Sequence, residues 1–380
     1  MGDQPPMHIA LLHNLDHDLL EDDPGREARK DVAKVAQALA SALDGSGARA
    51  QLVPVTGAAD LLSSLEGLRP DLVINLCESL AADSRGEMAI PLLLDLLHIP
   101  YTGSAALSLG LALHKHKAKE VLFARGVPTP AFALVERMDD LAGLDLPFPL
   151  IVKPDREDAS AGVDFDSVVH TRAQLERACR AVLTRFHQPA LVEQYVDGPE
   201  VYVPLLGNRG GGRAHLPLTE IRFGAAFAAR PRILSYRAKW EADSAECKDS
   251  PSVPCTLGAR EQERLRAVAT AAFDALECRD YGRVDLRLGA DGDAYVIDVN
   301  PNCDLHPEAG FARAAAEAGI TYQALAARLV EIALERSHGN TPSRRSGSAV
   351  ARRAAVANRN LLAGRGHLRA GAHRPRASAE

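Results

Sequence analysis

The chain has 380 residues, of which 46% are hydrophobic and 25% charged, and its formal net charge is −6 at pH 7. These values exclude a collagen-like or wholly disordered protein and predict two or three packed units. The six cysteines show no CxxC pair and no metal-ligand spacing, so we expect neither a disulfide framework nor a structural zinc site. No segment reaches about 18 uninterrupted apolar residues, and we therefore expect a cytoplasmic protein.

The first hundred residues alternate strand and helix patterns, an order that predicts a mostly parallel sheet. Apolar runs indicate the strands, and apolar faces at helical spacing indicate the helices. The strands are expected at 8–14, 51–55 and 71–78, and the helices at 28–39, 58–68 and 88–96. No GxGxxG follows the first strand and no P-loop motif occurs, so a dinucleotide-binding fold of the usual kind and a P-loop NTPase lose their main support.

Beyond residue 100 the pattern is mixed. A helix carries Lys115 and Lys119 on one face. The other expected elements are strands at 147–154 and 189–196, helices at 172–186, 259–276 and 322–335, a β-like stretch at 201–240 and a polar loop at 241–258. Residues 341–380 contain nine arginines and one acid, which predicts a disordered, solvated tail, with nucleic-acid binding as the weaker alternative.

The stretch 282–302 carries the most chemistry, because alternation gives each of its two strands an apolar and a polar face. The expected apolar face carries Val284, Leu286, Leu288, Tyr295, Ile297 and Val299, and the expected polar face carries Arg283, Asp285, Arg287, Asp298 and Asn300. A two-residue turn at Asp291-Gly292 would place Asp285 opposite Asp298 and Arg283 opposite Asn300. These oxygen ligands predict a Mg²⁺ site, and a solvated hairpin face is the alternative.

A second candidate is Lys153 with the small-residue loop that follows it. Backbone N–H groups of such a loop can approach a phosphate closely while the ammonium neutralises the same group. An ordinary turn explains the loop equally well when it is considered alone.

Together these segments resemble the ATP-grasp ligases, most closely the D-alanine-D-alanine ligase family, over about residues 70–335. The matching motifs occur in family order: NLCES at 75–79, IPYTGS at 99–104, Lys115 and Lys119, VKP at 152–154, VEQYVDGPE at 192–200, SYRAKW at 235–240, RVDLR at 283–287 and DVNPN at 298–302.

The resemblance implies a role for each matching residue. It assigns Lys115, Lys153 and Lys239 to the phosphates of ATP, Glu193 and the Val196 backbone to adenine, Glu200 to the ribose, and Ser160 and Gly162 to the loop that closes over the phosphates. It assigns Asp285, Asp298 and Asn300 to two Mg²⁺ ions, with Mn²⁺ as the alternative, and Arg283 to the transition state. Arg283, Lys239 and Ser160 are thus the expected catalytic residues.

The resemblance also implies an α/β ATP-grasp fold with a Rossmann-like N-terminal domain. We expect that domain at 1–102, a central ATP-grasp subdomain at 103–200, a C-terminal subdomain with the metal hairpin at 201–337, and the tail at 338–380. The implied reaction joins a carboxylate to an amine through an acyl phosphate, releasing ADP and phosphate, in peptidoglycan synthesis for the cell wall. The expected partners are small amino acids or peptides. We expect neither a membrane nor a nucleic acid as a partner, and the resemblance leaves a homodimer open as the assembly.

Several positions depart from the family pattern. The family's glutamate-containing motif after the first strand is missing from residues 11–27, and its Ser-Leu pair is missing from residues 303–311. Ala159 replaces a serine, Trp240 a tyrosine and Asp298 a glutamate. The nucleotide half is therefore retained and the dipeptide half is altered, which predicts poor use of D-alanine.

Three functions remain open. They are a ligase of D-alanine or another amino acid or peptide, a ligase of a secondary or modification pathway, and an ATP-binding protein without catalysis. Arg283, Asp285 and Asn300 argue against the third, because a protein that only binds ATP needs no transition-state arginine.

Overall fold

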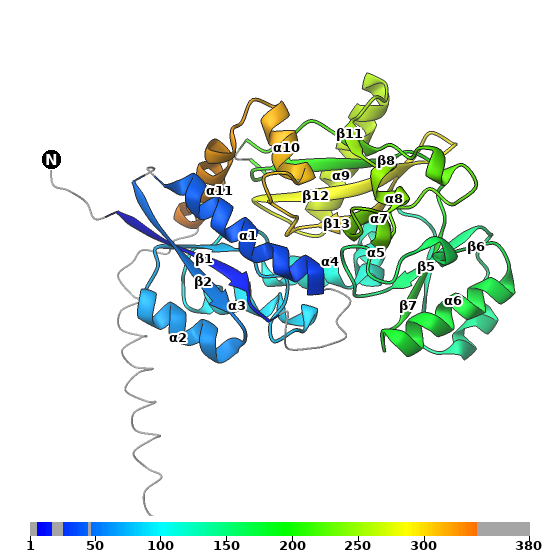
Figure 1. Cartoon of the computed structure of the whole chain (residues 1–380), viewed down its shortest axis with the longest axis horizontal. Helices are drawn as coiled ribbons and strands as arrows, with labels where there is room; N and C mark the ends of the chain where they lie inside the picture. The colour runs from blue at the N-terminus through cyan, green and yellow to red at the C-terminus, as the bar shows by residue number, and fades with distance from the viewer. Residues whose placement is uncertain (1–5, 17–25, 45–46, 211, 340–380) are drawn as a thin grey trace, which may run out of the picture. The chain divides into compact units, whose positions relative to one another are not determined.

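The computed structural model describes residues 6–16, 26–44, 47–210 and 212–339 (Figure 1). The described residues up to Glu335 belong to one compact unit. The predicted tail at 338–380 lies almost wholly outside the described residues. Among the described residues, no helix is long and apolar enough to span a membrane.

The N-terminal sheet is parallel, as predicted, and has the strand order β2-β1-β3. Its strands are β1 (Met7–Asn14), β2 (Ala48–Val55) and β3 (Leu72–Asn75), and its helices are α1 (Arg26–Leu43), α2 (Ala58–Leu68) and α3 (Ala89–Leu96). Helix α1 packs on one face of this sheet, whereas Leu61 and Leu65 of α2 and Ile90 and Leu94 of α3 join the apolar cluster of the other face.

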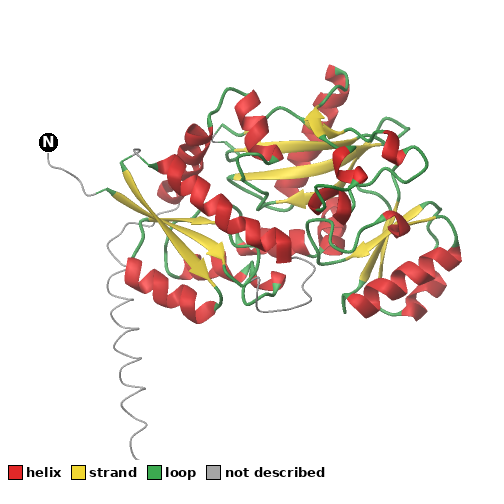
Figure 2. Cartoon of the chain, in the orientation of Figure 1, coloured by secondary structure: helices red, strands yellow, loops and turns green. Residues whose placement is uncertain are grey.

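The central sheet has the order β4-β7-β5-β6 and is covered by α6 (Figure 2). It consists of β4 (Phe132–Val135), β5 (Leu150–Pro154), β6 (Val168–Val169) and β7 (Ala190–Gln194), and the helices of this region are α4 (Ala106–Leu113), α5 (Lys115–Ala124) and α6 (Arg172–Arg185). Leu175, Cys179 and Val182 of α6 pack on the sheet because they repeat at helical spacing. Strand β5 carries Lys153 near its end.

The third sheet has the order β11-β10-β8-β12-β13, with β9 paired to β8. Its strands are β8 (Glu200–Leu206), β9 (Ala214–His215), β10 (Thr219–Ile221), β11 (Ser252–Pro254), β12 (Tyr281–Leu288) and β13 (Ala294–Asn300). Helix α9 (Ala259–Ala275) packs on it through Leu265, Ala269 and Phe273, and α5 shares the same cluster through Ala118 and Leu122. The remaining helices are α7 (Tyr236–Trp240), α8 (Ala245–Lys248), α10 (Gly310–Glu317) and α11 (Tyr322–Gly339), with 3₁₀ turns at Ser84–Gly86, Met138–Gly143, Phe165–Ser167 and Ala225–Phe227.

The β12–β13 hairpin has the predicted pairs Arg283↔Asn300 and Asp285↔Asp298, but it reaches them by a different path. The turn has three residues, since the Gly289 N–H donates to the Asp293 carbonyl, and a register shift beyond Asp285 leaves Ile297 as an extra residue. The extra residue in the turn shifts the register by one, and the extra residue at the Ile297 bulge shifts it back. The polar face is therefore paired as expected.

The bulge makes the predicted apolar face of β13 wrong at two positions. Ala294, Val296 and Val299 are the buried residues, whereas Tyr295 and Ile297 are only half-buried. One extra residue reverses the alternation on one side of the bulge, and this moves Tyr295 and Ile297 to the other face.

Three further expectations need correction. The SYRAKW segment, expected to be β-like, forms α7, whose N-cap Ser235 accepts from the Ala238 N–H. The polar loop expected at 241–258 contains α8 and the edge strand β11. Helix α10 was not predicted, and it packs with α11 and α1 in one apolar cluster that includes Tyr281.

Gly198 between β7 and β8 offers a test of this packing. A Cβ added there would overlap the carbonyl oxygen of Leu288, which belongs to the backbone and cannot move aside cheaply. We expect Gly198→Ala to lower the free energy of unfolding by about 2 kcal/mol or more, measured by urea titration. Gly67→Ala is the matched control, because nothing lies within 4 Å of that Cβ in helix α2, and it should be neutral or stabilising. Equal effects of the two substitutions would contradict the close approach.

Candidate active site

A pocket lies between the central sheet and the β12–β13 hairpin. Its lining includes the predicted residues Lys115, Lys153, Ser160, Glu193, Val196, Glu200, Lys239, Arg283, Asp285, Asp298 and Asn300. Gly162 is not among the lining residues. It adopts φ +75°, and an added Cβ would meet the side chains of Pro154 and Phe186, so this glycine shapes the loop beside the pocket.

Lys115, the first residue of α5, is buried between two carboxylates. Its Nζ lies 2.8 Å from Asp158 Oδ1 and 3.4 Å from Asp298 Oδ2. Burial alone would lower the pKa of Lys115, but the two carboxylates raise it above its usual range. Asp155 holds the start of α5, since its carboxylate accepts from the backbone and ring nitrogens of His116. The ammonium is therefore charged and fixed at the pocket.

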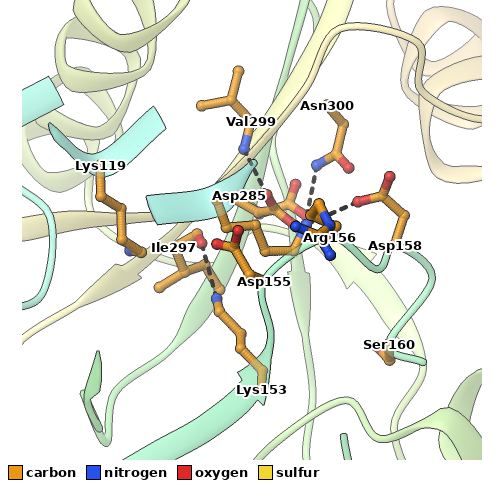
Figure 3. Close-up of polar contacts among 12 residues, drawn as sticks. Lys119, Lys153, Asp155, Arg156, Asp158, Ser160, Asp285, Ile297, Val299 and Asn300 are labelled. Carbon is orange, nitrogen blue, oxygen red and sulfur yellow. Dashed lines mark hydrogen bonds and ion pairs between the residues drawn. The ribbon is translucent and has the colours of Figure 1, made fainter. Parts of the chain in front are cut away.

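Glu193 of β7 is buried between two more lysines. Its Oε1 lies 2.6 Å from Lys153 Nζ and its Oε2 3.2 Å from Lys119 Nζ. Burial would raise the pKa of Glu193, but the two ammonium groups lower it. Burial lowers the pKa of Lys119 to about 8, although Glu193 opposes the shift. Figure 3 shows Lys153 reaching the Ile297 carbonyl at the bulge, a contact of 3.4 Å.

Arg283 and Asp285 form a bidentate pair on β12. The two nitrogen–oxygen distances are 2.6 and 2.9 Å, and the guanidinium also stacks 4.5 Å above the ring of Tyr202. Asn300 donates its side-chain amide to Asp285 at 3.2 Å (Figure 3). Burial raises the pKa of Asp285, with Arg283 opposing, whereas the pKa of Asp298 is lowered because Lys115 and Lys153 outweigh its burial.

The donor set on this face fits a hard cation. Asp285 and Asp298 are directly paired across the hairpin, and Asn300 adds an amide oxygen. No group of three His, Cys, Asp or Glu side chains in the described part of the chain could hold a metal ion. Mg²⁺ commonly takes only one or two carboxylates, with water and substrate phosphates completing its shell. The residues present are therefore compatible with Mg²⁺, provided that Asp285 shares its oxygens with Arg283.

The pocket also contains an arginine for which the sequence analysis indicated no role. Arg287 of β12 pairs with Glu200 at 2.6 Å and donates to the Val196 carbonyl at 2.9 Å. The hydroxyl of Tyr202 donates to the other oxygen of Glu200 at 2.9 Å. The alternation of RVDLR placed Arg287 on the polar face, but no motif indicated its partners.

Two loops close over the pocket and are bonded to each other. Ser160 Oγ donates to the Leu234 carbonyl at 2.8 Å, and the Tyr236 N–H donates to the Val163 carbonyl at 3.0 Å. The Trp240 indole N–H donates to the Ala159 carbonyl at 3.1 Å. The alanine and the tryptophan that depart from the family pattern thus contact each other through backbone and indole.

Known proteins resemble this chain in sequence and in fold. A family model described as "D-ala D-ala ligase C-terminus" matches residues 121–331. The chain is 35% identical over 288 residues to the uncharacterized protein y4sG of Sinorhizobium fredii, covering 74% of this chain and 82% of that protein. It is 32% identical over 312 residues to a D-alanine-D-alanine ligase of Chromohalobacter salexigens, covering 81% and 91%.

A solved structure of D-alanine-D-alanine ligase from Bacillus anthracis complexed with ATP superposes with a TM-score of 0.69, covering 88% of this chain and 100% of that chain at 21% identity. This likeness confirms the predicted ATP-grasp fold with its parallel N-terminal sheet. The matched family model and the relatives above 30% identity, taken with this fold, show that the chain belongs to the D-alanine-D-alanine ligase family of ATP-grasp proteins.

Proposed function

We propose that this protein is an ATP-dependent carboxylate-amine ligase whose preferred substrates are not two D-alanines. The observation that carries the proposal is the convergence of Lys115, Lys153 and Arg283 with the Asp285/Asp298/Asn300 face on one pocket. Phosphoryl transfer needs charge neutralisation and alignment more than covalent catalysis, and this set of side chains supplies both.

In the proposed reaction, a carboxylate oxygen of the first substrate attacks the γ-phosphorus and ADP leaves. The amine of the second substrate then attacks the acyl carbon, loses one proton and expels phosphate. Lys115 and Lys153 would neutralise the transferring group, and Arg283 would meet the negative charge that develops on the phosphoryl group and on the tetrahedral carbon. Mg²⁺ held at Asp285, Asp298 and Asn300 would neutralise phosphate charge.

The two loops that are bonded to each other beside the pocket support the part of the proposal that concerns the substrates. Trp240 adds a second side-chain bond between the two loops by donating to the Ala159 carbonyl, beside the bond from Ser160 to the Leu234 carbonyl. The departures from the family pattern at Ala159 and Trp240 remove polar groups that would face a small zwitterion. A site without partners for the charged groups of a small zwitterion binds that substrate poorly, because the charges lose their water and gain no new contact.

Arg283 tests the catalytic part of the proposal. We expect Arg283→Lys to lower kcat by about 10²- to 10³-fold while the Kd of ATP changes by less than about threefold, because a lysine cannot form the bidentate pair with Asp285. Steady-state kinetics and nucleotide titration measure the two quantities, with the melting temperature as a check on folding. A variant with normal kcat would remove Arg283 from the mechanism.

The carboxylate face tests the metal part. ATP should raise the melting temperature more with Mg²⁺ than with excess chelator, because Asp285 and Asp298 would hold the ion and the ion would neutralise phosphate charge. Asp298→Asn should reduce the difference between the two conditions. Equal stabilisation with and without the ion in the unaltered protein would overturn the metal assignment.

The substrate part is tested by ADP release screened over pairs of D- and L-amino acids. We expect D-alanine alone to give a kcat/KM at least about a hundredfold below the best pair, which corresponds to roughly 2.7 kcal/mol. The best pair should also yield a product with a new C–N bond, seen by mass spectrometry. A value for D-alanine within tenfold of the best pair would restore the plain D-alanine-D-alanine ligase assignment.

A further inference from the structure

Arg287 is buried in β12, with only 4% of its surface exposed, and it is one of the residues that line the pocket. It lies on the same strand face as Arg283 and Asp285, which are four and two residues away. An arginine taken out of water needs partners for its donors, and the residues around it supply them.

The guanidinium joins three separate segments of the chain. It pairs with Glu200 at the start of β8, donates at 2.9 Å to the carbonyl of Val196 in the turn after β7, and donates to the carbonyl of Arg232 in the segment before α7. Its carbon also lies 5.4 Å from the ring centroid of Tyr195. A lysine could not make these contacts at once, because they use the planar fork of a guanidinium.

The contact with Glu200 has a specific geometric effect. Tyr202 donates to Oε1 and Arg287 to Oε2, so both carboxylate oxygens are oriented while lone pairs remain for further donors. Val196, Glu200, Tyr195 and Tyr202 all line the pocket. Arg287 therefore fixes both the Glu200 carboxylate and the turn that contains Val196.

We propose that Arg287 is a positioning residue that orients Glu200 to accept hydrogen bonds from the ribose hydroxyls of the nucleotide, and so determines the preference for a ribonucleotide. This inference rests on the proposed function and on the role at the ribose that the family resemblance implies for Glu200. Arg287 acts through Glu200 and the Val196 turn, and it does not touch the transferring phosphoryl group.

The test compares the affinities of the full-length protein for ATP, 2′,3′-dideoxy-ATP and inorganic tripolyphosphate by calorimetry with Mg²⁺ present. The unaltered protein should prefer ATP over the dideoxy analogue by about tenfold or more. Arg287→Met keeps the apolar stem and removes the fork, so the preference should fall to within about twofold of unity. Binding of tripolyphosphate should change by less than about twofold.

Arg279→Met is the matched control. Arg279 donates to the Gly103 carbonyl and the Tyr101 hydroxyl and stacks over Tyr101, but it is not among the lining residues of the pocket. The Arg279→Met substitution should lower the free energy of unfolding without changing the preference for ATP over the dideoxy analogue. If Arg287→Met does not fold, Arg287→Lys takes its place, with the same expected loss of preference.

Two results separate the hypotheses. A folded Arg287 variant that keeps the full preference for ATP, or an unaltered protein that binds ATP without any preference, overturns the inference and leaves the proposed ligase intact. An unaltered protein that binds none of the three compounds overturns the proposed function itself.

Discussion

Buried charge is the constraint on which the rest of the site depends. Lys115 and Lys119 are buried and Lys153 is half-buried, and each has a carboxylate within about 3.5 Å that keeps its charge compatible with the fold. Glu193, Asp298 and Asp158 supply these carboxylates from three different elements. Removing one partner of such a pair typically costs about 3–5 kcal/mol. The lysines that would meet phosphate in the proposed function therefore also hold α5, β7 and β13 together.

This arrangement has a consequence for nucleotide binding. Asp158, in the loop after Lys153, forms an ion pair with Lys115, although the Asp158 side chain is more than half exposed. An arriving phosphate would compete with this carboxylate for the ammonium, so part of the binding energy goes into separating the pair. Glu193 is different, because it is buried with both lysines and belongs to the permanent structure.

Much of the fold and of the pocket could be predicted, because the spacing of apolar residues and the order of the strand and helix patterns each have one physical cause. The parallel strands of the N-terminal sheet followed from apolar runs, and the pairing of Asp285 with Asp298 followed from alternation and a turn signal. The turn itself was wrong by one residue, and only the bulge at Ile297 restored the register. Bulges leave little local signal, since any strand residue can be the extra one.

Contacts made by backbone or by distant segments escaped prediction for a related reason. The Trp240 indole meets a carbonyl of Ala159, 81 residues away, and no side-chain motif encodes that bond. Arg287 likewise reaches two carbonyl groups besides Glu200. Helix α10 is short and rich in alanine, so its small apolar face becomes evident only where it packs with α1 and α11.

The central claim is transfer of a phosphoryl group to a carboxylate, and isotope transfer tests it most directly. The protein is given ATP, the best amine substrate and a partner whose carboxylate carries ¹⁸O, and the released phosphate is analysed by mass spectrometry. Passage through an acyl phosphate places one ¹⁸O atom from the carboxylate in each phosphate formed with product. Phosphate free of ¹⁸O, released together with ADP, would mean that the protein only hydrolyses ATP, and this result would contradict the ligase mechanism.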